Sequence, residues 1–222
     1  GAPQLNWDYT TMVGREKESL KLREALHRVR GEGAQAECIL LHGYSGTGKS
    51  MLATTVVEHE SRENCFFFAL GKYDQNEGRE RPFGAIEESL TTLCRIISED
   101  SDASVIESIQ STVDENELLT LSTVVPKLAS VVPVAQVSST HSHVVGDAGM
   151  IRISQIIRSF LQAIATPDKP LVLLLDDLQW ADESSRALLR SFFGDRQLSN
   201  ILLIGTLRDG ETKTFDIPHN SV

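Results

Sequence analysis

The sequence predicts an α/β fold, a three-layer α/β/α sandwich in which helices cover both faces of a parallel sheet. Two observations predict it. Short, wholly apolar runs such as Leu171 to Leu175 are typical of strands that are buried on both faces. These runs alternate along the chain with longer stretches in which apolar residues recur at helical spacing, and that alternation indicates strand–helix–strand units.

Size and composition fit one such domain, and we take residues 1–222 as a single unit. Hydrophobic residues make up 41% of the chain, which is enough for a substantial core. The 21 basic and 31 acidic residues give a net charge of −10, which argues against a dedicated nucleic-acid surface. Three widely spaced cysteines match neither a disulfide framework nor a metal-ligand pattern, so we expect a reducing, cytoplasmic setting. No apolar run reaches the ~18 residues that a membrane span needs.

The first half of the chain has clear local signals. Apolar residues recur with helical spacing over 15–30 and 83–98, which predicts two helices, and a third helix is expected at 50–60, directly after a glycine-rich turn. Apolar runs at 38–41 and 65–70 predict two buried strands between them.

The second half begins with a region that is harder to interpret. A short helix is expected within 99–117, whereas 118–134 has no clear period and 135–149 is typical of a mobile loop. The pattern then becomes regular again and predicts a helix, a strand, a helix and a strand, at 150–165, 171–175, 183–193 and 201–204. The polar tail from Asp209 contains no convincing strand.

A glycine-rich turn follows the strand at 38–41, and its spacing matches the phosphate-binding loop in full. The loop consists of Gly43, Tyr44, Ser45, Gly46, Thr47, Gly48, Lys49 and Ser50. Its glycines let backbone N–H groups approach an anion, and the next helix points its positive end there. The pattern predicts that Lys49 bridges the β- and γ-phosphates of a nucleotide and that Ser50 offers its hydroxyl to Mg²⁺. Met51, the next residue, is also assigned to the nucleotide site.

Two carboxylates follow the most apolar strand, 171–175. Asp176 and Asp177 should lie at the carboxyl edge of the sheet, where ligands of α/β proteins collect. Asp176 is predicted to hold Mg²⁺, and Asp177 to orient or deprotonate the attacking water. An ordinary acidic turn would give the same pattern, but its pairing with the phosphate loop favours the functional interpretation.

The last predicted strand leads into Gly205-Thr206-Leu207-Arg208. Arg208 is placed to reach a γ-phosphate and sense its loss, with Thr206 as a weaker candidate for the same role. An ordinary surface arginine is the alternative.

Together these motifs resemble the AAA-type ATPase module of STAND-class signalling proteins, over about residues 12–209. That module occurs in large LuxR-type regulators, multidomain kinases and class III adenylate cyclases. The matching segments are Val13-Gly14-Arg15-Glu16, Gly71-Lys72-Tyr73-Asp74-Gln75 with Arg81-Pro82-Phe83, the run from Leu175 to Asp182, and the run from Leu203 to Asp209.

The resemblance implies a P-loop NTPase core of the ASCE/AAA type, with ATP or ADP as the nucleotide and Val13, Gly14 and Arg15 over the adenine. It also implies a molecular switch that binds and hydrolyses ATP, in which opening often drives self-association. A kinase, cyclase or DNA-binding output domain would lie elsewhere in the same polypeptide. Many relatives carry Glu where this chain has Asp177, and the shorter side chain predicts slow hydrolysis.

One departure from the family concerns the fifth strand, which would flank the strand that leads into the phosphate loop. The tail from Asp209 offers none, so we expect an unpaired apolar edge and a C-terminally truncated fragment of a larger signalling protein. Two other functions remain open: a DNA-associated AAA-type ATPase, such as an origin-recognition or transposition helper, and a nucleotide-binding interaction module without turnover.

Overall fold

The computed structural model describes residues 14–75, 82–100, 102–132, 147–194, 198–209 and 220–221. At its centre lies a parallel sheet with the strand order β2-β3-β4-β1-β5. The strands are β1 (Glu37–Gly43), β2 (Phe67–Lys72), β3 (Leu171–Asp176), β4 (Ile201–Arg208) and the short β5 (Asn220–Ser221).

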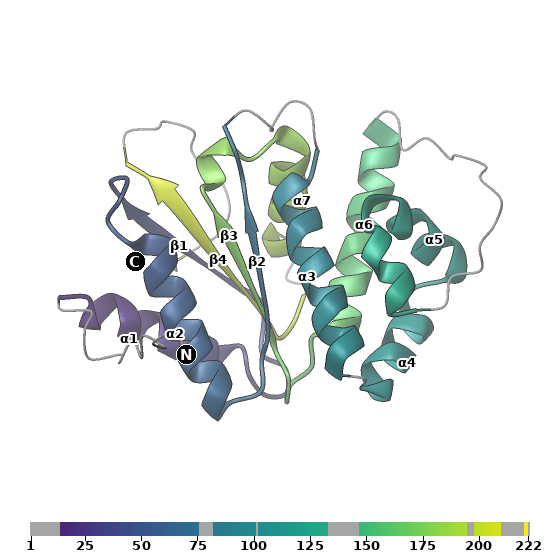
Figure 1. Ribbon diagram of the computed structural model, residues 1–222, viewed down its shortest axis with the longest axis horizontal. Helices are drawn as coiled ribbons and strands as arrows, with labels where there is room; N and C mark the ends of the chain where they lie inside the picture. Colours follow the sequence, from purple (N-terminus) through teal and green to yellow (C-terminus); the bar gives the residue numbers. More distant parts are fainter. Residues whose placement is uncertain are drawn as a thin grey trace, which may run out of the picture.

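Helices cover both faces of this sheet, which confirms the predicted three layers (Figure 1). One face carries α1 (Glu16–Arg28) and α2 (Lys49–Glu63), and the other carries α3 (Gly84–Asp100), α6 (Asp147–Ile164) and α7 (Glu183–Gly194). Outside α3 and α6 pack α4 (Ala103–Thr112), α5 (Glu115–Val124) and the 3₁₀ helix η2 (Pro126–Ser130). A second 3₁₀ turn, η3 (Leu178–Trp180), follows β3. None of the described helices has the length and apolar character needed to cross a membrane.

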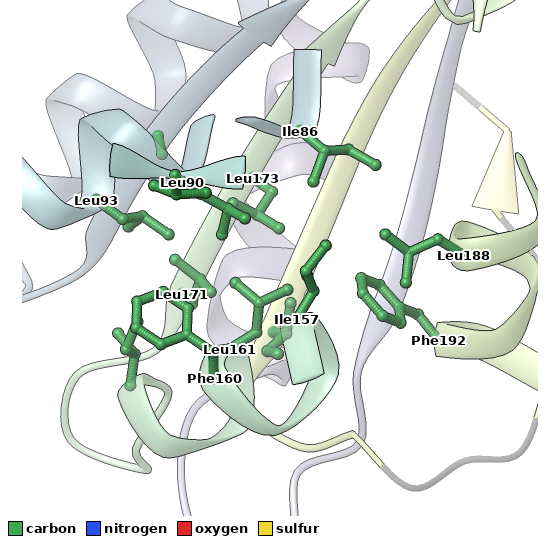
Figure 2. Packing of buried hydrophobic residues seen from close by; sticks show 14 of the residues in the cluster. Ile86, Leu90, Leu93, Ile157, Phe160, Leu161, Leu171, Leu173, Leu188 and Phe192 are labelled. Atoms are coloured by element: carbon green, nitrogen blue, oxygen red, sulfur yellow. The ribbon is translucent and has the colours of Figure 1, made fainter. Parts of the chain in front are cut away.

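The central strand β3 is apolar throughout because both of its faces are covered. Leu171 and Leu173 join the cluster formed with α3, α6 and α7, whereas Val172 and Leu174 join the cluster formed with α1 and α2. Figure 2 shows Leu171 and Leu173 among the side chains of the first cluster. Full burial of one such side chain contributes about 2 kcal/mol.

The carboxyl ends of the strands are aligned at one edge of the sheet. Gly43 of β1 is in register with Arg208 of β4, and Lys72 of β2 is in register with Asp176 of β3. Because the strands are parallel, these residues lie along a single edge, which is where ligands of such sheets bind.

Close packing between β2 and α3 fixes the position of the carboxyl end of β2. A Cβ placed on Gly71 would lie 1.8 Å from the backbone oxygen of Ala85, so no side chain fits between the strand and the helix. The backbone N–H of Lys72 donates to Glu88 Oε2 of α3 at 2.8 Å. These contacts place the backbone of Lys72 firmly at the carboxyl edge.

The fifth strand differs from the sequence prediction. Asn220 and Ser221 pair with Ile39 and Leu40 of β1, so the expectation that the tail contains no strand and leaves this edge unpaired is wrong. A pair of polar residues has neither an apolar run nor an alternation that a sequence pattern could detect.

The helices differ from the prediction in smaller ways. Residues 147–149 belong to α6 although a loop was expected there, and α5 and η2 occupy the stretch without a clear period. The start of α5 does carry a local signal, since Asp114 and Glu117 form a reciprocal capping box. The other residues of the predicted loop at 135–149, together with Val13 and Arg81, lie outside the described residues.

Candidate functional site

The loop between β1 and α2 has a backbone conformation that depends on glycine. Gly46 and Gly48 have φ angles of +78° and +80°, in the left-handed region that glycine adopts without strain. A Cβ on Gly43 would lie 3.2 Å from Thr47 Oγ1, so a side chain there would crowd the loop. The three glycines of the sequence motif are therefore needed by the loop itself.

The first turn of α2 suits an anion. Its N-cap, Gly48, makes no side-chain cap, and the turn contains no acidic residue, in contrast to the first turns of α1, α3, α5 and α7. First-turn N–H groups have no partner within a helix, and the helix dipole is positive at this end. Lys49 is buried, and its ammonium donates to the backbone oxygens of Gly43 and Tyr44 at 2.8 and 2.9 Å. This combination fits the phosphates of a nucleotide.

Ser50 and Asp176 meet although 126 positions separate them in the chain, and Ser50 Oγ donates to Asp176 Oδ1. Thr206 Oγ1 of β4 donates to the same oxygen at 2.6 Å and accepts from the backbone N–H of Asp177 at 2.9 Å. Because Thr206 is only 1% exposed, its hydroxyl positions both aspartates from within the sheet. A hydroxyl and a carboxylate side by side are the hard oxygen ligands that Mg²⁺ prefers, so this pair fits the predicted metal.

Asp177 has a different set of partners. Arg208 contacts both of its carboxylate oxygens, with Nε 3.0 Å from Oδ1 and Nη2 3.1 Å from Oδ2. Gln179 Nε2 also donates to Oδ1, at 2.8 Å. Burial raises the pKa of Asp177, but the hydrogen bonds from Arg208 and Gln179, with the charges of Arg208 and Lys72, outweigh burial and leave the pKa below its ordinary value. Asp177 is therefore ionised at neutral pH.

The start of α1 lies against the phosphate loop. Arg15 Nη2 donates to the backbone oxygen of Thr47 at 2.9 Å, which brings the N-terminal motif and the loop together. Tyr44 and Met51 extend from the loop and the first turn of α2 as exposed side chains, available to a ligand. Val13, the third residue predicted to cover the adenine together with Gly14 and Arg15, lies outside the described residues.

A comparison with protein families shows where this arrangement belongs. The AAA ATPase domain family matches residues 11–204, which is most of the chain. This chain belongs to the AAA ATPase domain family. The matched part of the AAA ATPase domain contains the phosphate loop and both aspartates, and it ends before Arg208.

The AAA ATPase domain is also similar to individual proteins. It is 29% identical over 185 residues to the hybrid signal transduction histidine kinase G of Dictyostelium discoideum. That match covers 81% of this chain but 5% of the kinase, so the chain spans a small part of the length of this relative. Among solved structures, the unbound monoclinic form of the bacterial conjugative coupling protein TrwBdeltaN70 matches 84% of this chain and 68% of its own, with 12% identity and a TM-score of 0.31.

Two residues of the site in this AAA ATPase domain were not found from the sequence. Gln179 contacts Asp177, and the ammonium of Lys72 lies 3.7 Å from an oxygen of each aspartate. Both lie in segments that resemble the family, residues 71–75 and 175–182, but the spacing of those segments assigns no chemical role to either side chain. For Lys72 the usable signal is its position at the end of a strand, which becomes informative only when β2 is known to lie beside β3.

Asp182 has a structural role that explains part of the segment from Leu175 to Asp182. Its carboxylate accepts from the backbone N–H and the hydroxyl of Ser185, at 2.9 and 2.5 Å, and so caps the start of α7. It also accepts from the backbone N–H of Phe83 at 3.2 Å, which links α7 to the residue before α3. The acidic end of this segment thus stabilises the frame around the site.

Proposed function

We propose that this chain is the ATP-binding switch domain of a multidomain signal-transduction regulator, and that it hydrolyses ATP slowly with the help of Mg²⁺. Membership of the AAA ATPase domain family supports nucleotide binding and ATPase chemistry. The assignment of individual residues rests on the geometry of the sheet edge, and the signalling role rests on the histidine kinase relative.

The observation that carries the proposal is the hydrogen bond between Ser50 and Asp176. It joins Ser50, in the first turn of α2, to Asp176 at the end of the buried strand β3. The N-terminus of α2 has no side-chain cap. Such a hydroxyl and carboxylate, with phosphate oxygens, form the usual environment of Mg²⁺ in nucleotide sites. When bound, Mg²⁺ would supply positive charge that polarises the terminal phosphate.

The side chains of this domain would have separate roles. Lys49 and the first-turn N–H groups of α2 would bind the β- and γ-phosphates. Arg208 would exchange its ion pair with Asp177 for phosphate oxygens, to which a guanidinium can donate two parallel hydrogen bonds. Once released, Asp177 would orient the attacking water and accept its proton.

The environment of Asp177 supports slow turnover. A carboxylate with a lowered pKa is a weak base, and here both of its oxygens are engaged by Arg208. The same observation favours the second candidate function, a nucleotide-binding interaction module without turnover. Release of phosphate from ATP, measured with the protein in excess, separates the two, because the module releases none.

The histidine kinase relative supports a signalling context. A match within a signal transduction histidine kinase supports an output domain, such as a kinase, a cyclase or a DNA-binding module, in the same polypeptide as this one. ATP-dependent opening and self-association would then transmit the state of the site to that domain. The free thiols of Cys38, Cys65 and Cys94 support a reducing, cytoplasmic setting.

Binding of a fluorescent ATP analogue to the Lys49→Ala variant tests the proposal. Loss of an ammonium that bridges two phosphates should weaken binding by about a hundredfold. Lys127→Ala removes the same charge from η2 and should bind like the wild type. Undiminished binding by a Lys49→Ala variant with the melting temperature of the wild type would overturn the proposal.

A further inference from the structure

The positively charged side chain of Lys72 lies close to both acidic residues of the site, Asp176 and Asp177. It is the last residue of β2 and is in register with Asp176. Its ammonium lies 3.7 Å from Asp176 Oδ2 and 3.7 Å from Asp177 Oδ2. The other oxygen of Asp176 accepts from Ser50 and Thr206, so Lys72 faces the oxygen that these hydroxyls do not use.

The backbone of Lys72 is firmly placed, whereas its ammonium is weakly held. Gly71 packs on Ala85, and the N–H of Lys72 is bonded to Glu88. By contrast, the side chain is 59% exposed, and its distances to the aspartates exceed those of a hydrogen bond. Exposed ion pairs of this kind contribute little to the stability of the fold. The flexible side chain of lysine therefore lets the ammonium move from one partner to another.

The charges around the site indicate which ligand would attract Lys72. Asp176 and Asp177 balance Lys72 and Arg208. A divalent cation held by Ser50 and Asp176 would place a like charge near the Lys72 ammonium, and like charges repel. A terminal phosphate beside the same carboxylates would instead offer Lys72 a charged hydrogen bond. A nucleoside diphosphate brings the cation without that phosphate.

We propose that Lys72 is a specificity-determining residue that favours a nucleoside triphosphate over a diphosphate, by moving its ammonium from Asp176 and Asp177 to the terminal phosphate. This proposal rests on the proposed function. In this proposal two strands supply residues that detect the third phosphate: β2 supplies Lys72, and β4 supplies Arg208.

Two dissociation constants measured on the full chain test the role of Lys72. One is for a non-hydrolysable ATP analogue with Mg²⁺, and the other is for ADP with Mg²⁺. Lys72→Met keeps an unbranched side chain of similar size and removes its charge. It should weaken binding of the triphosphate by about tenfold, the loss of one partly exposed charged hydrogen bond, and leave ADP binding unchanged or tighter. Lys72→Arg keeps the charge and should retain most of the preference.

Lys127→Met, on η2, is the matched control and should leave both constants unchanged. Lys72→Gln, a second variant without the charge, carries the same expectation as Lys72→Met. An unchanged ratio of the two constants in both variants, or equal weakening of both nucleotides, overturns the role of Lys72 while the proposed function stands. Failure of the wild-type chain to bind either nucleotide overturns both.

Discussion

Arg208 and Asp177 form a bidentate ion pair, with Nε–Oδ1 and Nη2–Oδ2 distances of 3.0 and 3.1 Å. The sequence predicts a separate role for each residue at a terminal phosphate, from the ends of two different strands. In the folded chain each is the partner of the other. In the proposed function, Arg208 would have to leave Asp177 before either residue could act on a phosphate, so exchange of this ion pair would be a step at which turnover is controlled.

Replacing Asp177 with Asn tests the catalytic role proposed for it. The amide keeps the size of the side chain, so we expect ATP to bind about as well as to the wild type. The amide cannot accept a proton from the attacking water. Hydrolysis should fall by about a hundredfold or more, the usual effect of losing a general base. Phosphate release in a single turnover, measured beside equilibrium binding on the same preparation, gives both quantities. Unchanged release would show that another group activates the water.

Replacing Arg208 with Met should make stability depend on pH in a defined way. The pKa of Asp177 is lowered in the folded chain, so its ionised form stabilises the fold above the pKa of the unfolded state, about 3.9. That contribution is lost as the pH falls through the folded-state pKa. Without Arg208, the interaction that most lowers the pKa disappears and burial, which raises it, remains.

The Arg208→Met variant is therefore expected to melt at a lower temperature than the wild type near neutral pH, and the difference should narrow below about pH 4. Thermal melts over this range check the expectation. A constant difference at every pH would mean that the loss comes from packing of the arginine stem rather than from the charge of Asp177.

Replacing Gly71 with Ala should separate α3 from β2. The new Cβ would lie 1.8 Å from the backbone oxygen of Ala85, and neither backbone can move without displacing its element. We expect a loss of about 3 kcal/mol in the free energy of unfolding. Gly33→Ala is the matched control, since Gly33 has a φ of +73° and open space around its Cβ position, and backbone strain alone should cost about 1–2 kcal/mol. Urea unfolding compares them, and the larger loss belongs to Gly71→Ala.

Most helices and strands could be predicted because each carries its own local signal. Strand β3 is a continuous apolar run, and α3 repeats its apolar residues with helical spacing. The helix α5 has no clear apolar period, although its capping box at Asp114 and Glu117 marks its start. The strand β5 has no local signal at all, because only its pairing with Ile39 and Leu40 makes it a strand.

The candidate site was predictable where its functional residues lie within short segments of the sequence that have a recognisable pattern. The phosphate loop is complete within eight consecutive residues, from Gly43 to Ser50. Asp176 and Asp177 follow a strand that is recognisable by itself. Lys72 and Gln179 lie in segments that resemble the family, but no local pattern assigns them a role, since their contacts with the aspartates depend on the order of the strands and on the path of the chain after β3.

The sequence alone determined the α/β fold and predicted a phosphate-binding loop at the end of the first strand, because apolar period and glycine spacing are local properties of the chain. The tertiary structure decided which charged groups act on one another. It placed Lys72 beside Asp176 and Asp177, bonded Ser50 to Asp176, and paired Arg208 with Asp177. Electrostatic interactions depend on distance in space, and only the parallel packing of β2, β3, β4 and β1 brings residues from distant parts of the chain to one edge.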